Sequence, residues 1–450
     1  MLPATPPLFE ESPVLILTLN CWSYSVRYQL FDWNAYSVLA HGEVERISMG
    51  GTTITHTTGN GTSYRRGFEC PDHRAGIAAI LAALTDPGAA VISNLRDITA
   101  IGHRVVHGGD TFTHSTLLDG EVLAAIREAQ QLAPLHNAPN IAGIEAARSL
   151  FPHIPHVAIF DTAFHQTMPE HAYLYPLPMD WYTQHGVRRY GFHGPPHLYL
   201  SRRAALLLNK RPADCNLVTI HLSKGVSLCA IRNGCSVDTS MGLTPLEGAI
   251  MDTRCGDIDP GIPPFIIEEG NLTARSMDNI LNQKSGMAGI TGSVADRHQV
   301  QERAAAGDDR CLLALKMESY RLRKYIGSYI AAVGQPDAVV FTADSGEAGW
   351  LLREMTLQGL ECFGIAMDGD RNRSAIGDEK EWCISRDESK VRILVIPTKE
   401  QLVFAEDVAA IIAGRHPGPL SYDYRFARPE SGMEPAVTYA GTGRKNNKVA

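Results

Sequence analysis

The sequence has no CxxC pair, no excess of basic residues and no long apolar run. Its nine cysteines are scattered and odd in number, which favours reduced thiols over a disulfide framework. Lysine and arginine total 41 against 49 acidic residues, and the net charge of −8 argues against a broad nucleic-acid-binding surface. No segment approaches the roughly 20 apolar residues of a membrane helix, and residues 1–13 lack the basic start of a signal peptide. We therefore expect a soluble, cytoplasmic protein that binds neither nucleic acid nor a membrane.

Strand-like and helix-like stretches alternate along a chain whose 450 residues are enough for two or three domains. Apolar runs predict strands at 14–19, 26–31, 98–106, 156–160, 217–221, 227–231, 338–342 and 391–396. Helical spacing predicts helices over 73–84, 117–132, 141–151, 311–333 and 401–413. This alternation predicts an α/β layer architecture. On the helix over 311–333 we expect four apolar residues to lie in the core: Leu312, Leu313, Leu315 and Met317.

Two polar turns join pairs of apolar strands in the same way. Asn20-Cys-Trp-Ser-Tyr-Ser25 separates the first pair, and Ser223-Lys-Gly225 separates a later pair. Such turns can present polar groups to a phosphate. The two copies suggest a duplicated domain with phosphate-binding turns that face each other across a cleft, although two unrelated hairpins would read the same way. From about residue 416 the chain shows no periodicity, and we expect a mobile tail there.

Six strings that combine Arg, His, Asp and Gly lie beside the apolar strands, as an anion site at strand ends requires. They are residues 102–109, 134–137, 160–165, 188–194, 238–248 and 253–260. Together with the Asn20 string and Pro397-Thr-Lys-Glu400, they resemble acetate kinases in order and spacing, from about Pro13 to Ala413. The resemblance implies an α/β fold of the actin, sugar kinase and Hsp70 type, with two duplicated actin-like (ribonuclease H-like) domains around a central cleft. It implies a first domain at 13–163 plus about 402–415, a second at 164–401 with the nucleotide site and a homodimer interface, and the tail at 416–450.

The resemblance also implies reversible, direct in-line phosphoryl transfer between ATP and acetate, giving ADP and acetyl phosphate, with Mg²⁺ (or Mn²⁺) as cofactor. Because two anions must meet, catalysis depends on positioning and on charge stabilisation. By family position the catalytic residues are Arg104, His136, Asp161, His193 and Arg254. Arg104 and Arg254 could hold the carboxylate and the phosphoryl group through planar contacts, and His193 could donate to a phosphoryl oxygen. Asp161 could orient an arginine.

Further residues are assigned to ligands by the same resemblance. The acetate site comprises Arg104 with an apolar pocket of Val106, Leu135, Phe192 and Pro245. Because one methylene changes binding by only about 1–3 kcal/mol, propionate is a second candidate substrate. The residues for nucleotide and phosphate are Ser23, Ser25, Arg27, His221, Lys224, Gly225, Asp344, Gly346 and Glu347. Asn20 and Glu400, with water, could position the metal. Four other histidines are expected to be structural: His103, His107, His165 and His171.

The nucleotide strings depart from the family pattern while the carboxylate side does not. Trp22 and Tyr24 replace Gly and Ser, Ser223 and Lys224 replace Gly and Asn, Asp344 replaces Gly, Ala348 replaces Asn, and Asp252 replaces Gly. Three hypotheses follow. The first, which we favour, is an acetate kinase with repacked loops. The second is a short-chain acyl kinase that uses pyrophosphate or another nucleotide. The third is a degenerate paralogue that binds acyl phosphate or a partner protein as a regulator.

Overall fold

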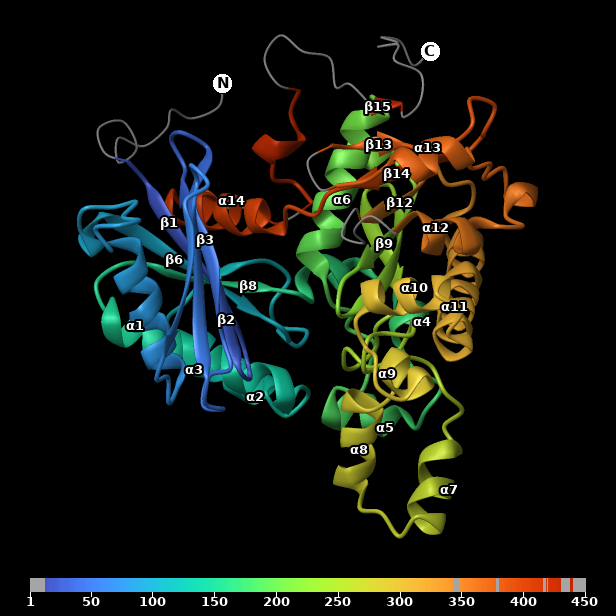
Figure 1. The fold of residues 1–450 in the computed structure, drawn as a ribbon, viewed down its shortest axis with the longest axis horizontal. Coiled ribbons are helices and arrows are strands. Elements are labelled where there is room, and N and C mark those ends of the chain that lie inside the picture. The colour runs from blue at the N-terminus through green and yellow to red at the C-terminus, as the bar shows by residue number, and fades with distance from the viewer. Residues whose placement is uncertain are drawn as a thin grey trace. The chain divides into compact units, whose positions relative to one another are not determined.

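The computed structural model describes residues 13–342, 349–377, 380–415, 418 and 420–429, together with the backbone of 438–439. The chain divides into two compact units, Met1–Ala163 with Glu400–Arg425 and Phe164–Lys399 with Phe426–Ala450. Each unit is built around one mixed β-sheet with helices packed against it (Figure 1). The first unit thus contains two separate segments of the chain, and the helix of its second segment begins at Glu400, one residue before the predicted start of that helix.

The first sheet has eight strands in the order β5-β4-β3-β2-β1-β6-β8-β7. The strands are β1 (Leu15–Trp22), β2 (Ser25–Asp32), β3 (Ser37–Glu45), β4 (Thr52–Thr58), β5 (Ser63–Phe68), β6 (Ile98–Val105), β7 (Thr116–Leu117) and β8 (His156–Phe160). The first five strands pair antiparallel in a meander. β1, β6 and β8 run parallel, so their carboxyl ends meet at one edge of the sheet.

Helices cover both faces of this sheet. The helices of the first unit are α1 (His73–Leu84), α2 (Gly120–Ala129), α3 (Pro134–Leu150) and α14 (Glu400–Ile412). Successive side chains of a strand point to opposite faces. Leu17 and Leu19 of β1 pack in one core with residues of α1 and α3. Thr18, between them, donates a hydrogen bond to Oε1 of Gln401 at 2.7 Å, which places α14 on the other face.

The second sheet has seven strands in the order β11-β10-β9-β12-β14-β13-β15. The strands are β9 (Leu217–Leu222), β10 (Val226–Arg232), β11 (Cys235–Thr239), β12 (Ala338–Thr342), β13 (Trp382–Cys383), β14 (Arg392–Ile396) and β15 (Thr438–Tyr439). β11-β10-β9 pair antiparallel, and β9-β12-β14 pair parallel. This repeats the order and directions of β3-β2-β1-β6-β8. The duplication predicted from the two hairpins is therefore confirmed in the topology.

The second unit carries most of the helices, and α6 and α11 pack against its sheet. These helices are α4 (Glu170–Tyr173), α5 (Met179–His185), α6 (Gly194–Leu207), α7 (Ile262–Glu269), α8 (Ala274–Gln283), α9 (Gly286–Thr291), α10 (Arg297–Ala305), α11 (Asp309–Val333), α12 (Gly349–Leu357) and α13 (Gly369–Ser374). Single 3₁₀ turns lie at Leu95–Asp97, Ala163–Thr167, Pro212–Asp214, Glu361–Phe363 and Arg425–Ala427. Across the described ranges, every helix is too short or too polar to traverse a lipid bilayer.

The structure differs from the sequence expectations in three helices. α2 is shorter than predicted because Leu117 belongs to β7, and Asp119 caps the helix by accepting from the Val122 N–H at 2.8 Å. α3 begins seven residues earlier than predicted, with Pro134 in its first turn, where a missing N–H costs nothing. On α11, the prediction that Leu313 and Met317 are core residues is wrong, since they are 50% and 40% exposed.

Part of the predicted mobile tail is packed. Tyr424 is buried, and its hydroxyl donates to Oδ1 of Asp407 on α14 at 2.9 Å. Phe426 is also buried, with its ring centroid 4.9 Å from that of Tyr199 on α6. A stretch without periodicity can still bury single aromatic side chains, which a search for repeating patterns does not detect.

Candidate active site

In the first unit, a buried ion pair lies at the carboxyl ends of β6 and β8. Arg104 is on β6, and Asp161 directly follows β8, the neighbouring parallel strand. Nε and Nη2 of Arg104 donate to the two carboxylate oxygens of Asp161 at 2.8 and 2.6 Å. The side chains are 9% and 1% exposed, so the pair is rigid and desolvated. Asp161 thereby holds Arg104 in one orientation at this edge of the sheet, while a part of either residue in catalysis stays a prediction.

Oxygen donors that suit a hard cation lie at the same edge. Burial alone would lower the pKa of Arg104, but the carboxylate of Asp161, with a smaller contribution from Glu400, raises that pKa above its usual value. Oδ1 of Asn20, near the end of β1, is buried and has no hydrogen-bond partner among the described residues. No group of three His, Cys, Asp or Glu side chains in the described part of the chain could hold a metal ion. Mg²⁺ takes oxygen ligands and keeps several of its waters, so the unsatisfied amide oxygen of Asn20 is a donor of the kind that this ion uses.

Trp22, which replaces a family glycine, contacts cationic side chains. Its ring lies 5.0 Å from the guanidinium carbon of Arg27 and 6.0 Å from that of Arg104. Arg27 also donates to Oε2 of Glu43 at 2.7 Å on an adjacent strand. The predicted phosphate ligand Arg27 is therefore already engaged by a carboxylate and an aromatic face. Of the two serines at this turn, Ser23 is exposed and Ser25 is half-buried.

Two buried asparagines fix the first two turns of α3 against the strand ends. Asn140 accepts from the Val106 N–H at 3.0 Å and donates to the carbonyl of Cys21 at 2.7 Å. Asn137 accepts from the His107 N–H at 3.0 Å and donates to the His107 carbonyl at 2.9 Å. These bonds hold the start of α3, which carries the predicted site residues Leu135 and His136, next to Val106. The Leu135 side chain is 49% exposed, His136 is half-buried and Val106 is buried.

In the second unit, a histidine cluster lies under the β9–β10 turn. His193, the N-cap of α6, adopts a left-handed backbone conformation with φ of 59°. Its Nδ1 is 2.8 Å from Oγ of Ser227, which is also 2.8 Å from Nε2 of His197. Burial, with His165 and His221 nearby, lowers the pKa of His197 well below its usual value, so His197 is neutral. The ring of His221 meets that of His193 edge to face at 4.8 Å.

Gly225 brings the turn directly against two predicted catalytic side chains. A Cβ at Gly225 would lie 2.9 Å from Nη2 of Arg254 and 3.1 Å from Cε1 of His193. Nδ1 of His193 is hydrogen-bonded to Ser227, so Nε2 is the ring nitrogen on the Gly225 side, 3.3 Å from that Cβ position. Arg254 and His193 therefore occupy the space that a side chain at this position would need, and only glycine leaves room for both beside the turn.

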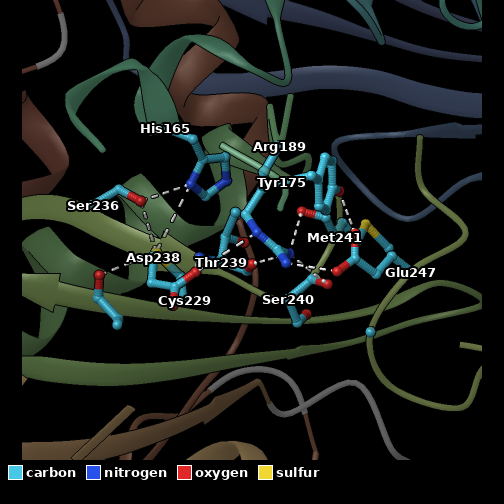
Figure 2. Close-up of polar contacts among 12 residues, drawn as sticks. His165, Tyr175, Arg189, Cys229, Ser236, Asp238, Thr239, Ser240, Met241 and Glu247 are labelled. Atoms are coloured by element: carbon cyan, nitrogen blue, oxygen red, sulfur yellow. Dashed lines mark hydrogen bonds and ion pairs between the residues drawn. The ribbon is translucent and has the colours of Figure 1, made fainter. Parts of the chain in front are cut away.

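An arginine that the sequence analysis did not assign fixes the loop after β11. Nη1 of Arg189 donates to the carbonyls of Thr239, Ser240 and Met241 at 2.8, 3.2 and 3.3 Å. Its Nη2 donates to Oε1 of Glu247 at 2.6 Å, and the hydroxyl of Tyr175 donates to the other oxygen of Glu247. Figure 2 shows these groups converging on the guanidinium.

The same loop carries Pro245, whose carbonyl accepts from Nη1 of Arg254 at 2.7 Å. Arg189 therefore supports Arg254 through the loop backbone. Both Pro245 and Phe192 are buried, and their assignment to an apolar pocket for the acetate methyl stays a prediction. The carbonyl of Phe192 is 2.9 Å from Nε2 of His165, and burial lowers the pKa of His165 to about 4. These contacts give His165 a structural role.

The remaining predicted nucleotide residues, Asp344, Gly346 and Glu347, lie outside the described residues. Lys224 is exposed at the β9–β10 turn, and Glu400 is the first residue of α14. Sequence reasoning missed Asn137, Asn140, Arg189 and Glu247, although three of them lie in or beside the polar strings. Their partners are distant in the sequence, so the only available signal was a polar residue inside an otherwise apolar pattern.

Comparison with known proteins identifies a single family. The model of the acetokinase family matches residues 15–406. The acetate kinase of Geobacter sulfurreducens is 56% identical over 417 residues, covering 93% of this chain and 99% of the relative. The acetate kinase of Treponema pallidum is 46% identical, covering 92% of this chain and 93% of the relative.

Solved structures agree. The acetate kinase of Porphyromonas gingivalis superposes with a TM-score of 0.83 at 41% identity, covering 89% of this chain and all of the other. A propionate kinase from Francisella tularensis gives 0.82 at 35% identity, covering 88% and 99%. The predicted α/β class with duplicated actin-like domains is confirmed by these neighbours and by the repeated strand order. With its family model matching from Leu15 to Glu406 and such close relatives, this chain belongs to the acetokinase family.

Proposed function

We propose that this protein is an acetate kinase, which transfers a phosphoryl group reversibly between ATP and acetate and forms ADP and acetyl phosphate. The observation that carries the proposal is the space beside Gly225, where a Cβ would come within 2.9 Å of Arg254 and 3.1 Å of His193, so that bare backbone, a guanidinium and an imidazole lie close together. Phosphoryl transfer needs little covalent chemistry from the protein and depends on positioned donors and cations. The assignment to the acetokinase family supports the same reaction.

Arg104 is proposed to bind the acetate carboxylate. Asp161 occupies Nε and Nη2, so Nη1 is the nitrogen that remains for the ligand, and the carboxylate partner keeps the guanidinium from rotating. His136, at the start of α3, is proposed to donate to an oxygen of the same reactant. The acetate methyl is assigned to Val106, Leu135, Phe192 and Pro245. Propionate is proposed as a weaker second substrate, since one methylene changes binding by about 1–3 kcal/mol.

Arg254 and His193 are proposed to stabilise the transferring phosphoryl group. Charge spreads over its equatorial oxygens in the transition state, and fixed donors lower the energy of that state. Each side chain is fixed by a hydrogen bond, Arg254 to the carbonyl of Pro245 and His193 to the hydroxyl of Ser227. His221, packed on His193, supports the imidazole. Backbone groups of the turn at Lys224 and Gly225, with Ser23 and Ser25 of the first hairpin, are proposed as phosphate contacts.

Mg²⁺ is proposed as the cofactor, with Asn20 and Glu400 as its protein ligands through water. When bound, the ion would neutralise part of the phosphate charge. The buried Oδ1 of Asn20, which accepts no hydrogen bond from the described residues, supports this proposal. A buried amide oxygen without a hydrogen-bond partner costs free energy unless a ligand satisfies it. Removal of divalent cations with EDTA should therefore abolish turnover, and Asn20→Ala should raise the Mg²⁺ concentration needed for half-maximal rate.

We further propose that the protein is a homodimer that associates through its second unit. Leu313, Met317 and Tyr320 of α11 are 50%, 40% and 61% exposed. Their spacing of four and three residues places them on one face of the helix. Such a stripe of large apolar side chains is typical of an interface. Light scattering should give a dimer, and Leu313→Glu with Met317→Glu should give a monomer if this face is part of the contact.

The test of the proposed function is phosphoryl transfer from acetyl phosphate with Mg²⁺ to ADP, to GDP and to inorganic phosphate in parallel. ATP formation that is lost in Arg254→Ala supports an acetate kinase. Product with GDP or phosphate alone would show a rebuilt donor site. No product with any acceptor, together with protection of the fold by acetyl phosphate against melting, would indicate a binding protein instead.

A further inference from the structure

A buried arginine outside the predicted site holds the β9–β10 turn. Arg297 is the first residue of α10, and its side chain is 7% exposed. Nη1 of Arg297 donates to the carbonyl of Ser223, the first residue of the turn, at 3.1 Å. Its Nε donates at 3.0 Å to Oε1 of Glu318, a fully buried carboxylate on α11. One guanidinium therefore joins the turn to two helices.

Asp252 connects the same guanidinium to the turn that carries Arg254. Its Oδ1 lies 3.6 Å from Nη2 of Arg297. Its backbone N–H donates to the carbonyl of Lys224 at 3.4 Å, and its own carbonyl accepts from Ala288 at the start of α9. Asp252 precedes Arg254 by two residues. The β9–β10 turn and the segment of Arg254 are therefore joined twice, by the backbone hydrogen bond between Asp252 and Lys224 and by the side chain of Arg297.

The charges of this group depend on one another. Burial raises the pKa of Asp252 to about 6. The nearby carboxylates of Glu318 and Asp296 add to this rise, and the positive charges of Arg297 and Lys224 oppose it. Burial likewise raises the pKa of Glu318, against the effect of Arg297. Removing one partner of a buried ion pair leaves the other charge without compensation, which is strongly destabilising. Arg297 forms an ion pair with each of these two carboxylates, so their charged forms depend on it.

We propose, on the basis of the proposed function, that Arg297 is a positioning residue of the nucleotide site. It holds the turn Ser223-Lys224-Gly225 against Arg254 and so sets the affinity for ATP, while the affinity for acetate does not depend on it. Lys224 and Asp252, which both depart from the family pattern, then belong to one network of compensating charges. The departures at Lys224 and Asp252 are therefore one linked change, and not two separate losses of nucleotide-binding residues.

The test compares Arg297→Lys with a matched control, Arg203→Lys. Lysine keeps the charge, but its single nitrogen cannot reproduce the two differently directed bonds to Ser223 and Glu318. Arg203 on α6 likewise bonds one carboxylate, that of Glu381, and one carbonyl, that of Phe426. Neither of these partners belongs to the turn. Loss of a bond from a charged donor predicts a KM for ATP raised about 10-fold in Arg297→Lys, with the KM for acetate unchanged. The control should change neither KM.

Amide hydrogen exchange gives a readout independent of activity. Amides of residues 217–232 should exchange faster in Arg297→Lys than in the wild type, and at the wild-type rate in Arg203→Lys. If Arg297→Lys does not fold, Arg297→Met with Glu318→Gln removes both charges together and should show the same rise in the KM for ATP. Equal rises in both KM values, or unchanged exchange at the turn, would overturn the proposal. A wild type that is inactive with ATP would instead refute the proposed function, and the exchange experiment would still report on Arg297.

Discussion

Replacement of Gly225 by alanine adds one methyl group in the space that Arg254 and His193 occupy beside the turn. The backbone of Gly225 is not in the left-handed region, so alanine introduces no conformational strain of its own. The new Cβ would lie 2.9 Å from Nη2 of Arg254, closer than such atoms approach in proteins, and 3.1 Å from Cε1 of His193. The ends of both side chains must therefore move by several tenths of an ångström.

The expected loss is in catalysis and not in stability. A misplacement of about 1 Å in a reacting geometry costs about 100-fold in rate, so a shift of a few tenths predicts a fall in kcat/KM of about 10-fold. Overpacking costs about 1–3 kcal/mol, and the lower value applies here because Arg254 is only half-buried and can shift. Steady-state kinetics in both directions and thermal melting measure the two quantities.

Gly327→Ala is the matched control. Gly327 lies within α11, and a Cβ there would meet nothing within 4 Å. Alanine in a helix interior is favoured over glycine by about 0.5–1 kcal/mol, so this variant should be slightly more stable and fully active. Wild-type kinetics in Gly225→Ala would refute the reasoning, because they would mean that the positions of Arg254 and His193 do not matter to the reaction.

Three further predictions concern charges. Asp161→Ala leaves Arg104 buried without its carboxylate and should lower the free energy of unfolding by about 3–5 kcal/mol, measured by urea titration; a loss below 1 kcal/mol would contradict the buried pair. Because the folded-state pKa of Asp252 is raised from 3.8 to about 6, its ionisation opposes folding. As the pH rises from 4 to 6, the free energy of unfolding should therefore fall by up to about 3 kcal/mol more in the wild type than in Asp252→Asn. Parallel profiles of unfolding free energy against pH in the two proteins would contradict this. Arg189→Met removes the donor to the carbonyls of the loop after β11 and should lower kcat with little change in the far-ultraviolet circular dichroism; unchanged kcat would show that the loop holds Arg254 without it.

The strands and their order follow from local sequence, because a buried strand requires a continuous apolar run and a tight turn requires polar residues. Val26–Phe31 and Ala338–Thr342 are therefore visible in the sequence, and the repeated hairpins indicate the duplication. The predicted catalytic residues Arg104 and Asp161 are also brought together, since they end neighbouring parallel strands. When two parallel strands are neighbours in a sheet, residues at their carboxyl ends lie close together in space even when they are far apart in the sequence.

Contacts between distant segments could not be predicted in this way. Arg189 and Glu247 meet across 58 residues, and Arg297 reaches Ser223 across 74. Neither arginine differs, in its local pattern, from an arginine on a solvated surface. The exposure of Leu313 shows the same limit, because helical spacing identifies a helix but does not determine which of its faces another element covers.

The position of α14 has a consequence for how the chain folds. This helix covers one face of the first sheet, yet it is separated from β8 by the whole run Phe164–Lys399. A Cβ on Gly102 of β6 would lie 2.8 Å from a side-chain carbon of Val408, which shows how closely the helix and the strand approach. During synthesis the strands of the first sheet emerge early, but this face stays open until residues 400–412 have left the ribosome. Closing such a long loop is slow, so the first unit is expected to be the last to complete its core and the part most exposed to aggregation or to chaperones before it does.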